Sequence, residues 1–358
     1  MTPVEEILDL ARWAPSGDNT QPWRFEIVSP SHFVVHGFDT RADCVYDLDG
    51  HSSQLAVGGL LETIGIAATK FGRTATTSRR PDTPDTHLLF DVRLAPSPKV
   101  TVSDLVPAIT VRSVQRRALS TRPLTGEQKA ALEASVAPGH EVVWIEGWGP
   151  KIRLVRLLWR NAGLRLTLPE AFEVHRRIID WGKQFSDDKV PDQALGLDPM
   201  TLKLTRWAFA SWRRVDLLNR YAFGTWAPRI QLDLIPGLAC GAHAALVSRD
   251  PLQGIDDYVA SGRAMQRFWL TACRLGLQLQ PEMTPVIFSR YAWQQRQFSR
   301  ATWAHPLADR LRSGLDEILG ASRSQRAAFM ARLGLGPRAR ARSRRRLLGE
   351  LRFRRASD

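Results

Sequence analysis

The chain has 358 residues, of which 44% are hydrophobic and 24% charged, a composition typical of a globular protein and not of a disordered or fibrous one. Its apolar stretches, such as LIPGLACGAHAALV, are too short to span a bilayer and are interrupted by Gly, Pro and His. The N-terminal MTPVEEILDL is acidic and lacks the pattern of a signal peptide. Cys44, Cys240 and Cys273 form no C-x-x-C pair and are odd in number, which argues against a disulfide framework or a zinc site and favours a cytoplasmic protein.

The net charge of +14 is concentrated near the C-terminus. Twelve arginines lie between Arg323 and Arg355, and from Arg323 to residue 358 only Glu350 and Asp358 oppose them. The rest of the chain is close to balanced, so the charge does not by itself predict a nucleic-acid-binding protein, although the basic segment leaves that partner open.

The first half of the chain is predicted to alternate helices with short strands. An amphipathic helix is expected over 3–13, and the turn-forming segment APSGDNTQPWRF follows it. The later elements are strands at 23–29 and 32–38, a helix over 52–72 with Gly72 as its C-cap, and a strand over 88–95.

A second half is predicted to begin after the Pro- and Ser-containing stretch APSPKVTVSDLVP. It opens with a helix over AITVRSVQRRAL, and Thr125 with Gln128 has the pattern of a capping box that starts the next helix. The later elements are a strand at HEVVWIEGW, long helices over about 150–220, a strand at ALVSR, a helix over 255–275 ended by Gly276, and a short strand at PVIFSR.

The segment from Trp159 to Trp226 contains five tryptophans. Large rigid aromatic side chains in a helical insertion are more often core than binding site, and a lid over a ligand is the alternative. No G-x-G-x-x-G, Walker A or H-E-x-x-H motif is present, and the histidines have no metal-ligand spacing. A Rossmann nucleotide site and a metal site are therefore not expected.

The loop from Pro15 to Trp23 reads P-S-G-x-N-x-Q-P-W and lies between a predicted helix and a predicted strand. It closely resembles the P-S-S-x-N-x-Q-P-W loop of the nitroreductase-like FMN oxidoreductases, which has the same neighbours. Members of that family are usually homodimers with two flavins at the subunit interface. The resemblance implies an α+β nitroreductase-like fold, with small mixed or antiparallel sheets flanked by helices. It also implies that the flavin ring and its polar edge lie against Pro15, Ser16, Gly17, Asn19 and Gln21.

The arginine element that this family places before the loop is displaced here. Residues 1–13 contain only Arg12, whereas R-S-V-Q-R at Arg112–Arg116 opens the second half and resembles the family's R-x-S-x-R/K helix. One half therefore has the loop and the other has the arginines, a pattern expected of two subunits fused into an intrachain pseudo-dimer with one FMN. The resemblance implies that Arg112 and Arg116 bind the flavin, with Val114 in place of the family's Ser.

Two further segments resemble flavin-binding elements of the family. GLQLQPEMTP resembles G-L-x-x-x-P-x-E-G, which puts the backbone of Met283 and Thr284 near flavin N5, with Thr284 in place of Gly. R-S-R-R-R at 342–346 resembles the C-terminal basic element that holds the 5′-phosphate, which implies a role there for Arg342, Ser343 and Arg345. The implied domains are 1–105, 106–336 with an insertion at about 159–226, and the Arg-rich segment 337–358.

The function implied by the resemblance is an FMN-dependent oxidoreductase. NADPH or NADH would be the donor and a flat electron-poor molecule of the quinone, nitroaromatic or enone type the acceptor, with no catalytic side chain required because the flavin does the chemistry. The chain would be a monomeric pseudo-dimer or a higher oligomer. The alternatives are a flavin-binding or flavin-sequestering protein without turnover, an oxygen-using flavin dehydrogenase of a dedicated metabolite, and a nucleic-acid or membrane-surface binder that uses the basic segment.

Overall fold

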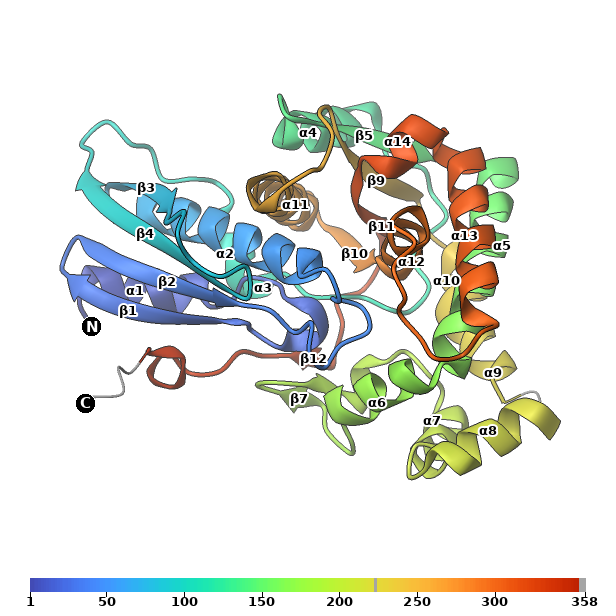
Figure 1. Cartoon of the computed structure of the whole chain (residues 1–358). Helices are drawn as coiled ribbons and strands as arrows, with labels where there is room; N and C mark the ends of the chain where they lie inside the picture. The colour runs from blue at the N-terminus through green and yellow to red at the C-terminus, as the bar shows by residue number, and fades with distance from the viewer. Residues whose placement is uncertain (222–223, 354–358) are drawn as a thin grey trace.

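The computed structural model describes residues 1–221 and 224–353, and it consists of two halves that lie side by side (Figure 1). Each half contains one four-stranded sheet in which every strand pairing is antiparallel. Helices lie beside both sheets, so the predicted α+β class is confirmed. No helix among the described residues is both long and apolar enough to cross a membrane.

The N-terminal half forms a sheet with the strand order β1-β2-β4-β3. Its core is closed by the buried faces of α1 and α2 packed against one side of this sheet. The elements of this half are α1 (Pro3–Ala11), β1 (Trp23–Ser29), β2 (His32–Phe38), α2 (His51–Thr69), β3 (Arg73–Arg79) and β4 (His87–Pro96).

The sheet of the C-terminal half has the same strand connectivity as the sheet of the N-terminal half. Its strand order is β5-β9-β11-β10, so in both sheets the third strand along the chain lies at an edge and the fourth lies between the second and the third. A helix also precedes the first strand, and a long helix joins the second strand to the third. The elements of this half are α4 (Gly126–Val136), β5 (His140–Ile145), β9 (Ala242–Ser248), α11 (Ile255–Arg274), β10 (Leu277–Pro281) and β11 (Ala327–Leu335).

Two mainly helical insertions separate strands of the sheet in the C-terminal half. The larger insertion lies between β5 and β9, and the smaller one between β10 and β11. The larger insertion contains α5 (Trp148–Thr167), α6 (Pro169–Ile178), β6 (Ile179–Asp180), β7 (Phe185–Ser186), β8 (Val190–Pro191), α7 (Pro199–Ala208), α8 (Trp212–Tyr221), α9 (Trp226–Arg229) and α10 (Ile235–Leu238). The smaller insertion contains α12 (Thr284–Trp293), α13 (Ala304–Leu319) and α14 (Ala321–Gln325).

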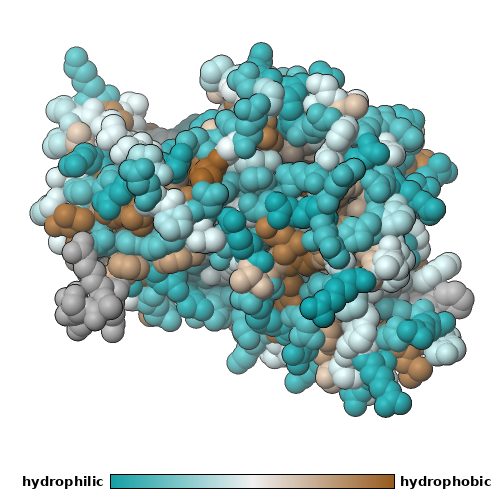
Figure 2. All heavy atoms as spheres, viewed as in Figure 1, coloured by the Kyte–Doolittle hydropathy of each residue, from teal (hydrophilic) through white to brown (hydrophobic). Residues whose placement is uncertain are grey.

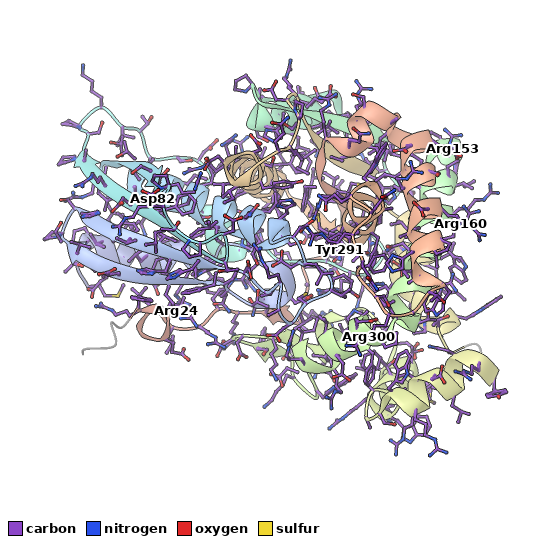
Figure 3. The ribbon with its side chains drawn as sticks, viewed as in Figure 1. Arg24, Asp82, Arg153, Arg160, Tyr291 and Arg300 are labelled. Atoms are coloured by element: carbon purple, nitrogen blue, oxygen red, sulfur yellow. The ribbon has the colours of Figure 1, made fainter. Side chains whose placement is uncertain are left out.

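The contacts that join the halves include the following three sets. The helices α2 and α11 pack side by side at their boundary (Figure 1). The loop before α2 reaches the C-terminal half, where the backbone N–H of Leu48 donates to the hydroxyl of Tyr291 at 2.9 Å, and Figure 3 shows Tyr291 in the interior. The C-terminal segment returns through β12 (Arg342–Ser343) to the N-terminal sheet, where Phe353 donates its backbone N–H to Phe25 at 2.9 Å.

Several elements predicted from the sequence are confirmed and others are wrong. The strands at 23–29 and 32–38, the capping box at Thr125 and the helix that ends before Gly276 are present. The short strand predicted at PVIFSR is wrong, because these residues lie in α12, which begins at Thr284 and has Pro285 in its first turn. The strands β3 and β11 were not predicted from the sequence, and β11 lies within the stretch from Arg323 to Arg355 that contains the twelve arginines.

The helix predicted over AITVRSVQRRAL is wrong beyond its first turn. The helix α3 (Val106–Val111) ends before Arg112, whose backbone leaves the helical region at φ −52° and ψ 131°. Val114 then forms a parallel bridge with Leu279, and the N–H of Gln115 donates to the carbonyl of Leu279 at 3.1 Å. Edge pairing with β10 therefore replaces the helix, and Arg112 and Arg116 do not share a helical face.

The five tryptophans of the insertion are not core residues, contrary to the preferred interpretation. None of them is buried, and Trp207 and Trp226 are about half exposed, at 48% and 51%. Trp159 packs instead under the guanidinium of Arg229, which lies 4.0 Å from its ring centroid. The basic segment 337–358 is described as far as Phe353, and its last five residues lie outside the described part of the chain.

Candidate functional site

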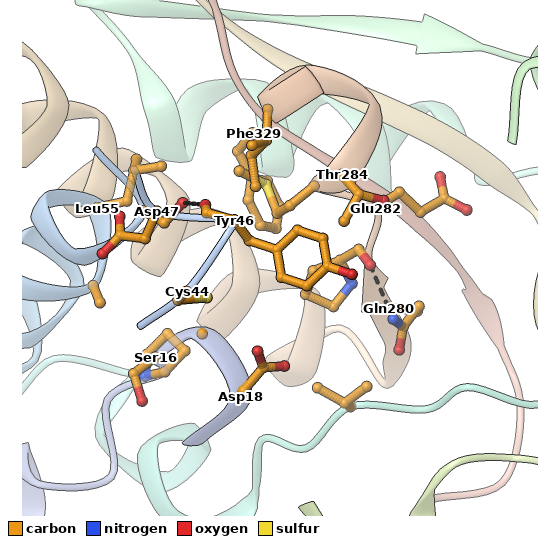
Figure 4. Close-up of a pocket in the computed structure, with 18 of the residues that line it drawn as sticks. Ser16, Asp18, Cys44, Tyr46, Asp47, Leu55, Gln280, Glu282, Thr284 and Phe329 are labelled. Atoms are coloured by element: carbon orange, nitrogen blue, oxygen red, sulfur yellow. Dashed lines mark hydrogen bonds between the residues drawn. The ribbon is translucent and has the colours of Figure 1, made fainter. Parts of the chain in front are cut away.

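A cavity of about 360 Å³ lies between the two halves and is lined by residues of both (Figure 4). A volume of this size is within the range of sites that bind small molecules or cofactors. The N-terminal half contributes the loop after α1 and the start of α2, and the C-terminal half contributes β10, the start of α12, and α5 and α6 of the insertion. The residues that line the cavity include Pro15, Ser16, Gly17, Asp18, Tyr46, Val114, Arg116, Asn161, Arg165, His175, Trp269, Gln280, Glu282, Met283, Thr284, Phe329 and Arg332.

The loop after α1 reaches the cavity through Pro15, Ser16 and Gly17. Its shape depends on left-handed backbone conformations at Asp18 and Asn19, with φ of 50° and 63°. Such conformations are uncommon for residues other than glycine, and they cluster at functional sites. Figure 4 shows the carboxyl of Asp18 directed into the cavity, and desolvation raises the pKa of this group above its ordinary value. The loop therefore presents both small residues and a carboxyl group to the cavity.

Asn19 and Gln21 belong to this loop but do not line the cavity. The Nδ2 of Asn19 donates to the carbonyls of Asp187 and Lys189, each at 3.2 Å, and the Nε2 of Gln21 donates to that of Asp187 at 2.8 Å. The Oε1 of Gln21 accepts from the backbone N–H of Arg346 at 2.9 Å. In this structure both amides join the loop to the turn between β7 and β8 and to the C-terminal segment, while Asn19 Oδ1 is buried without a recorded partner among the described residues.

The two arginines of the R-S-V-Q-R segment have different environments. Arg116 lines the cavity, donates from Nη1 to the carbonyl of Ala194 at 3.1 Å, and has its pKa lowered to about 10 by burial. Arg112 lies outside this cavity. Its Nη2 donates to the carbonyl of Trp13 at 2.8 Å, its guanidinium lies 4.4 Å from the ring centroid of Trp269, and burial lowers its pKa to about 9.

A smaller cavity of about 140 Å³ adjoins Arg112 and is also lined by Arg338. Trp269 borders both cavities, so the smaller one lies beside the larger. The Nε of Arg112 is buried without a recorded partner among the described residues. A buried donor of this kind favours an acceptor group in the smaller cavity.

The residues Arg342, Ser343 and Arg345 do not line the larger cavity; they fasten the C-terminal segment beside the loop after α1. Arg342 Nη2 donates to the carbonyl of Thr110 at 2.9 Å, Ser343 Oγ donates to that of Lys189 at 2.9 Å, and Arg345 Nε donates to that of Ala14 at 3.0 Å. Burial and the neighbouring guanidinium groups, that of Arg112 first among them, lower the pKa of Arg345 well below its ordinary value. Several cations are thus held near one another against backbone carbonyls.

Met283 and Thr284 do line the larger cavity, at the N-terminus of α12. The first amide groups of a helix have no partner within the helix, and they favour an anion or a polar acceptor. The Oγ1 of Thr284 accepts a hydrogen bond from Asn161 Nδ2 at 2.7 Å, which links α12 to α5 of the insertion.

Glu282, directly after β10, forms a buried group of charges with His243 and Arg332. This group was not predicted from the sequence. Glu282, a cavity residue, accepts from Arg332 Nη1 at 3.1 Å and contacts His243 Nδ1 at 2.7 Å. Burial alone would raise the pKa of Glu282, but His243 and Arg332 together lower it. Burial likewise opposes the charged form of His243, yet the nearby carboxylate raises its pKa to about 10. Glu282 lies within the segment that the family resemblance selected, whereas His243 is 39 residues away and no local pattern joins it to Glu282.

Tyr46 and His175 form a second polar pair in the cavity wall that the sequence analysis missed. The Tyr46 hydroxyl and His175 Nε2 are 3.0 Å apart, and Figure 4 shows the Tyr46 ring projecting into the cavity. Burial lowers the pKa of His175 to about 3, so its imidazole is neutral near pH 7. One residue comes from the N-terminal half and the other from the insertion, and only the folded chain brings them together.

Four side chains that line the larger cavity have buried polar atoms without a recorded partner among the described residues. Buried polar atoms in folded proteins are nearly always paired, so these atoms mark positions where a ligand can bind. The four atoms are Asn161 Oδ1, Arg165 Nε, Gln280 Oε1 and Arg332 Nε. Among residues 1–221 and 224–353, no group of three or more His, Cys, Asp or Glu side chains is arranged to hold a metal ion.

The sequence of this chain is similar to those of known proteins. No family model matches the chain. It is 33% identical over 137 residues to the "Putative NAD(P)H nitroreductase Rv3131" of Mycobacterium tuberculosis, a match that covers 38% of this chain and 40% of that protein. An uncharacterised protein of the same species, MT1398, is 23% identical over 289 residues, covering 79% of this chain and 39% of its own length. The chain therefore matches about two fifths of the length of each of these relatives.

Solved structures are also similar to this chain, and the two described here have low overall similarity. A nitroreductase-like family protein from Bacillus cereus has 15% identity and a TM-score of 0.35, covering 72% of this chain and 98% of its own. The FMN-dependent nitroreductase NfnB from Mycobacterium smegmatis, solved in complex with NADPH, has 18% identity and a TM-score of 0.36, covering 70% and 100%. The relationship therefore rests on the sequence matches, in which 137 residues of this chain are similar to proteins named as putative NAD(P)H nitroreductases.

Proposed function

We propose that this protein is an FMN-dependent oxidoreductase that binds one FMN per chain between its two halves. NADPH or NADH would be the donor and a flat electron-poor molecule the acceptor. One observation carries this proposal: three segments that resemble the family's flavin-binding elements, represented by Ser16, Arg116 and Thr284, line one cavity although they are far apart in the sequence.

The chemistry of the cavity fits the ring system of FMN. Its wall combines apolar and aromatic side chains, including Phe329 and Trp269, with the unpaired polar atoms of Asn161, Arg165 and Gln280. A flat heterocycle with donors and acceptors along one edge matches that combination, because its faces are apolar and its edge is polar. The strand order shared by the two sheets further supports the proposal that the chain is a fused pseudo-dimer.

The residues proposed to hold the ring come from both halves. Pro15, Ser16 and Gly17 would contact it from the N-terminal loop, and Arg116 together with the amides of Met283 and Thr284 would favour negative charge at its polar edge. Asn19 and Gln21 would act indirectly, since their amides fix the loop to the turn between β7 and β8.

We further propose that the phosphate of FMN lies in the smaller cavity. Arg112 and Arg338 line that cavity, and a guanidinium donates two hydrogen bonds at once to a phosphate. Arg342 and Arg345 would add to the positive potential near this site, in agreement with the resemblance of R-S-R-R-R to the family's C-terminal basic element.

When bound, FMN would supply a ring that accepts electrons from the nicotinamide donor and passes them to the acceptor. The residues of the chain would orient that ring and tune its environment. Glu282, kept ionised by His243 and Arg332, fixes a negative charge close to the start of α12. Neutral His175 and the hydroxyl of Tyr46, which also line the cavity, would offer hydrogen bonds to the acceptor.

The first test is the visible spectrum of the purified protein, followed by anaerobic addition of NADPH and of NADH. A yellow protein with one FMN per chain that bleaches on addition supports the proposal. A colourless protein that does not take up added FMN contradicts it.

The variant Arg112→Gln should bind FMN at least about tenfold more weakly than the unaltered protein, since a hydrogen bond to a charged group contributes about 1.5–3 kcal/mol. Arg117→Gln, a change at an exposed neighbour, serves as the control.

A second candidate function is flavin binding without turnover. It is favoured by the way the insertion covers the cavity, since Asn161, Arg165 and His175 of α5 and α6 all line it. In that case the protein is yellow with one FMN per chain, yet neither nicotinamide bleaches it. An oxygen-using dehydrogenase would also remain yellow, and it differs in being bleached by its own substrate.

A further inference from the structure

The helices α7 and α8 form an outlying corner of the molecule (Figure 1). We define the α7–α8 face as the exposed side chains that these two helices present at that corner. They are Met200, Lys203, Leu204, Arg206, Trp207, Arg213, Arg214 and Leu217. In Figure 2 this corner carries hydrophobic patches interrupted by hydrophilic side chains.

Three large apolar residues of α7 point away from the protein. Met200, Leu204 and Trp207 follow the spacing of one helical face and are 75%, 48% and 48% exposed. The buried positions of the same helix are held by Thr201 and Ala208. A surface helix of a globular protein normally turns its large apolar residues inward, so α7 has its most apolar side facing outward.

The α7–α8 face is also strongly cationic. Residues 199–229 contain six Lys and Arg residues and a single acid, Asp216, which pairs with Arg220 of the same helix. Among the described residues no carboxylate pairs with Lys203, Arg206 or Arg213. Arg214 extends across the ring of Trp207, with 4.8 Å between its guanidinium carbon and the ring centroid. Apolar and cationic groups thus alternate on one surface.

We propose that the α7–α8 face docks on an anionic lipid bilayer. Helices that lie in a membrane interface combine Trp and Leu on the side that enters the lipid with Lys and Arg that contact the phosphate groups. The charge of this face is nearly all of one sign, so a second copy of the chain would meet it with repulsion. Neither α7 nor α8 lines either of the two cavities described above, and docking on a bilayer requires no pocket for an anchoring side chain.

This face belongs to the same insertion that covers the cavity between the halves. Leu195, just before α7, and Leu232, just after α9, both line that cavity. Docking would therefore bring the cavity close to the bilayer surface. The inference does not depend on FMN binding, because it rests on exposure and charge alone.

The test is cosedimentation of the full-length protein with vesicles of phosphatidylglycerol and phosphatidylcholine, compared with vesicles of phosphatidylcholine alone. We expect binding to the anionic vesicles that weakens as salt is raised. The pair Leu204→Ser with Trp207→Ser should weaken it at least about tenfold, and so should the pair Arg206→Gln with Arg213→Gln, since each Lys or Arg near an anionic surface contributes about 1 kcal/mol. All four positions are exposed, so the fold should remain, which circular dichroism checks.

The matched controls alter exposed residues outside this face. Arg153→Gln with Arg160→Gln removes two cations of α5, both on the outer side of the molecule in Figure 3, and Trp148→Ser removes a tryptophan that is 70% exposed. These variants should bind as the unaltered protein does. Absence of binding to anionic vesicles would overturn the proposal. So would binding that the α7–α8 variants leave unchanged, since the lipid contact would then lie elsewhere, for example in the Arg-rich C-terminal segment.

Discussion

Gly58 and Gly262 occupy the eighth positions of α2 and α11, and each lies where the other helix comes closest. A Cβ added to Gly58 would lie 2.1 Å from the carbonyl oxygen of Val259, and one added to Gly262 would lie 2.1 Å from that of Leu55. Val259 and Leu55 in turn occupy the fifth positions of their helices. The contact between the halves is therefore reciprocal, residue for residue, which supports the proposal that they are equivalent units.

The first prediction concerns this crossing. Gly58→Ala or Gly262→Ala should lower the free energy of unfolding by roughly 1–3 kcal/mol, because the added methyl group forces two helix backbones apart. Gly65→Ala is the control, since Gly65 lies on the same helix with nothing within 4 Å of an added Cβ. That control should gain up to about 1 kcal/mol from helix propensity. Urea denaturation measures all three, and a stabilised Gly58→Ala variant would mean that the helices are farther apart than described.

The second prediction concerns the buried pair of His243 and Glu282. The pKa of His243 is about 10 in the folded protein, above its ordinary value near 6.5, so its stabilising contribution is complete below pH 6.5 and is lost as the pH rises toward 10. The slope for one proton is at most about 1.4 kcal/mol per pH unit. The pKa of Glu282 is lowered, so its own contribution is present near neutral pH and is lost in acid as the pH falls through that lowered pKa.

Urea denaturation of the unaltered protein and of His243→Gln at pH 6, 8 and 9.5 tests this pair. His243→Gln should remove the part of the loss of stability at alkaline pH that is due to this histidine. His305→Gln, at a half-buried position, should leave that loss of stability unchanged. Glu282→Gln should lower the free energy of unfolding at pH 7 by about 3–5 kcal/mol, because it leaves a buried cation without its partner. Identical pH profiles for His243→Gln and the unaltered protein would show that the histidine is neutral in the fold.

The third prediction concerns His175, whose pKa of about 3 results from burial. The unfolded chain binds a proton at this residue below about pH 6.5 and the folded protein does not, so stability should fall as the pH drops from 6.5 toward 3. Nitrogen-15 NMR of histidine-labelled protein at pH 5 should contain one neutral imidazole that is absent in His175→Gln. A protonated His175 at pH 5 would mean that water reaches this part of the cavity wall.

Local patterns in the sequence predicted those features whose cause is local. The strands at 23–29 and 32–38 are rich in β-branched and aromatic residues and are joined by a tight turn, and the capping box at Thr125 depends on residues three positions apart. The segment after Arg112 was predicted as helix because its partner, Leu279, is more than 160 residues away. Its backbone pairs with the edge of β10, and no local pattern encodes that edge.

The same distinction holds for the candidate site. The motif around Ser16 selected a loop that does line the cavity, but the contacts of Asn19 and Gln21 with the turn at Asp187 require the folded insertion. Glu282 and His243 come together only because β10 and β9 both pair with β11, which lies between them. Residues whose roles depend on long-range packing were therefore out of reach of motif and spacing arguments.

The last prediction concerns Arg345, which is buried near other cations and has its pKa lowered well below the ordinary value by desolvation. Replacing a buried charge with an apolar side chain of similar volume is often neutral or stabilising, so Arg345→Met without flavin should unfold at about the same urea concentration as the unaltered protein. Its affinity for FMN should nevertheless fall by about tenfold or more, since the phosphate would lose a nearby cation. Flavin fluorescence titration measures the affinity, and Arg344→Met, at an exposed neighbour, is the control. A large loss of stability with unchanged affinity would instead assign Arg345 the single role of joining the C-terminal segment to the carbonyl of Ala14.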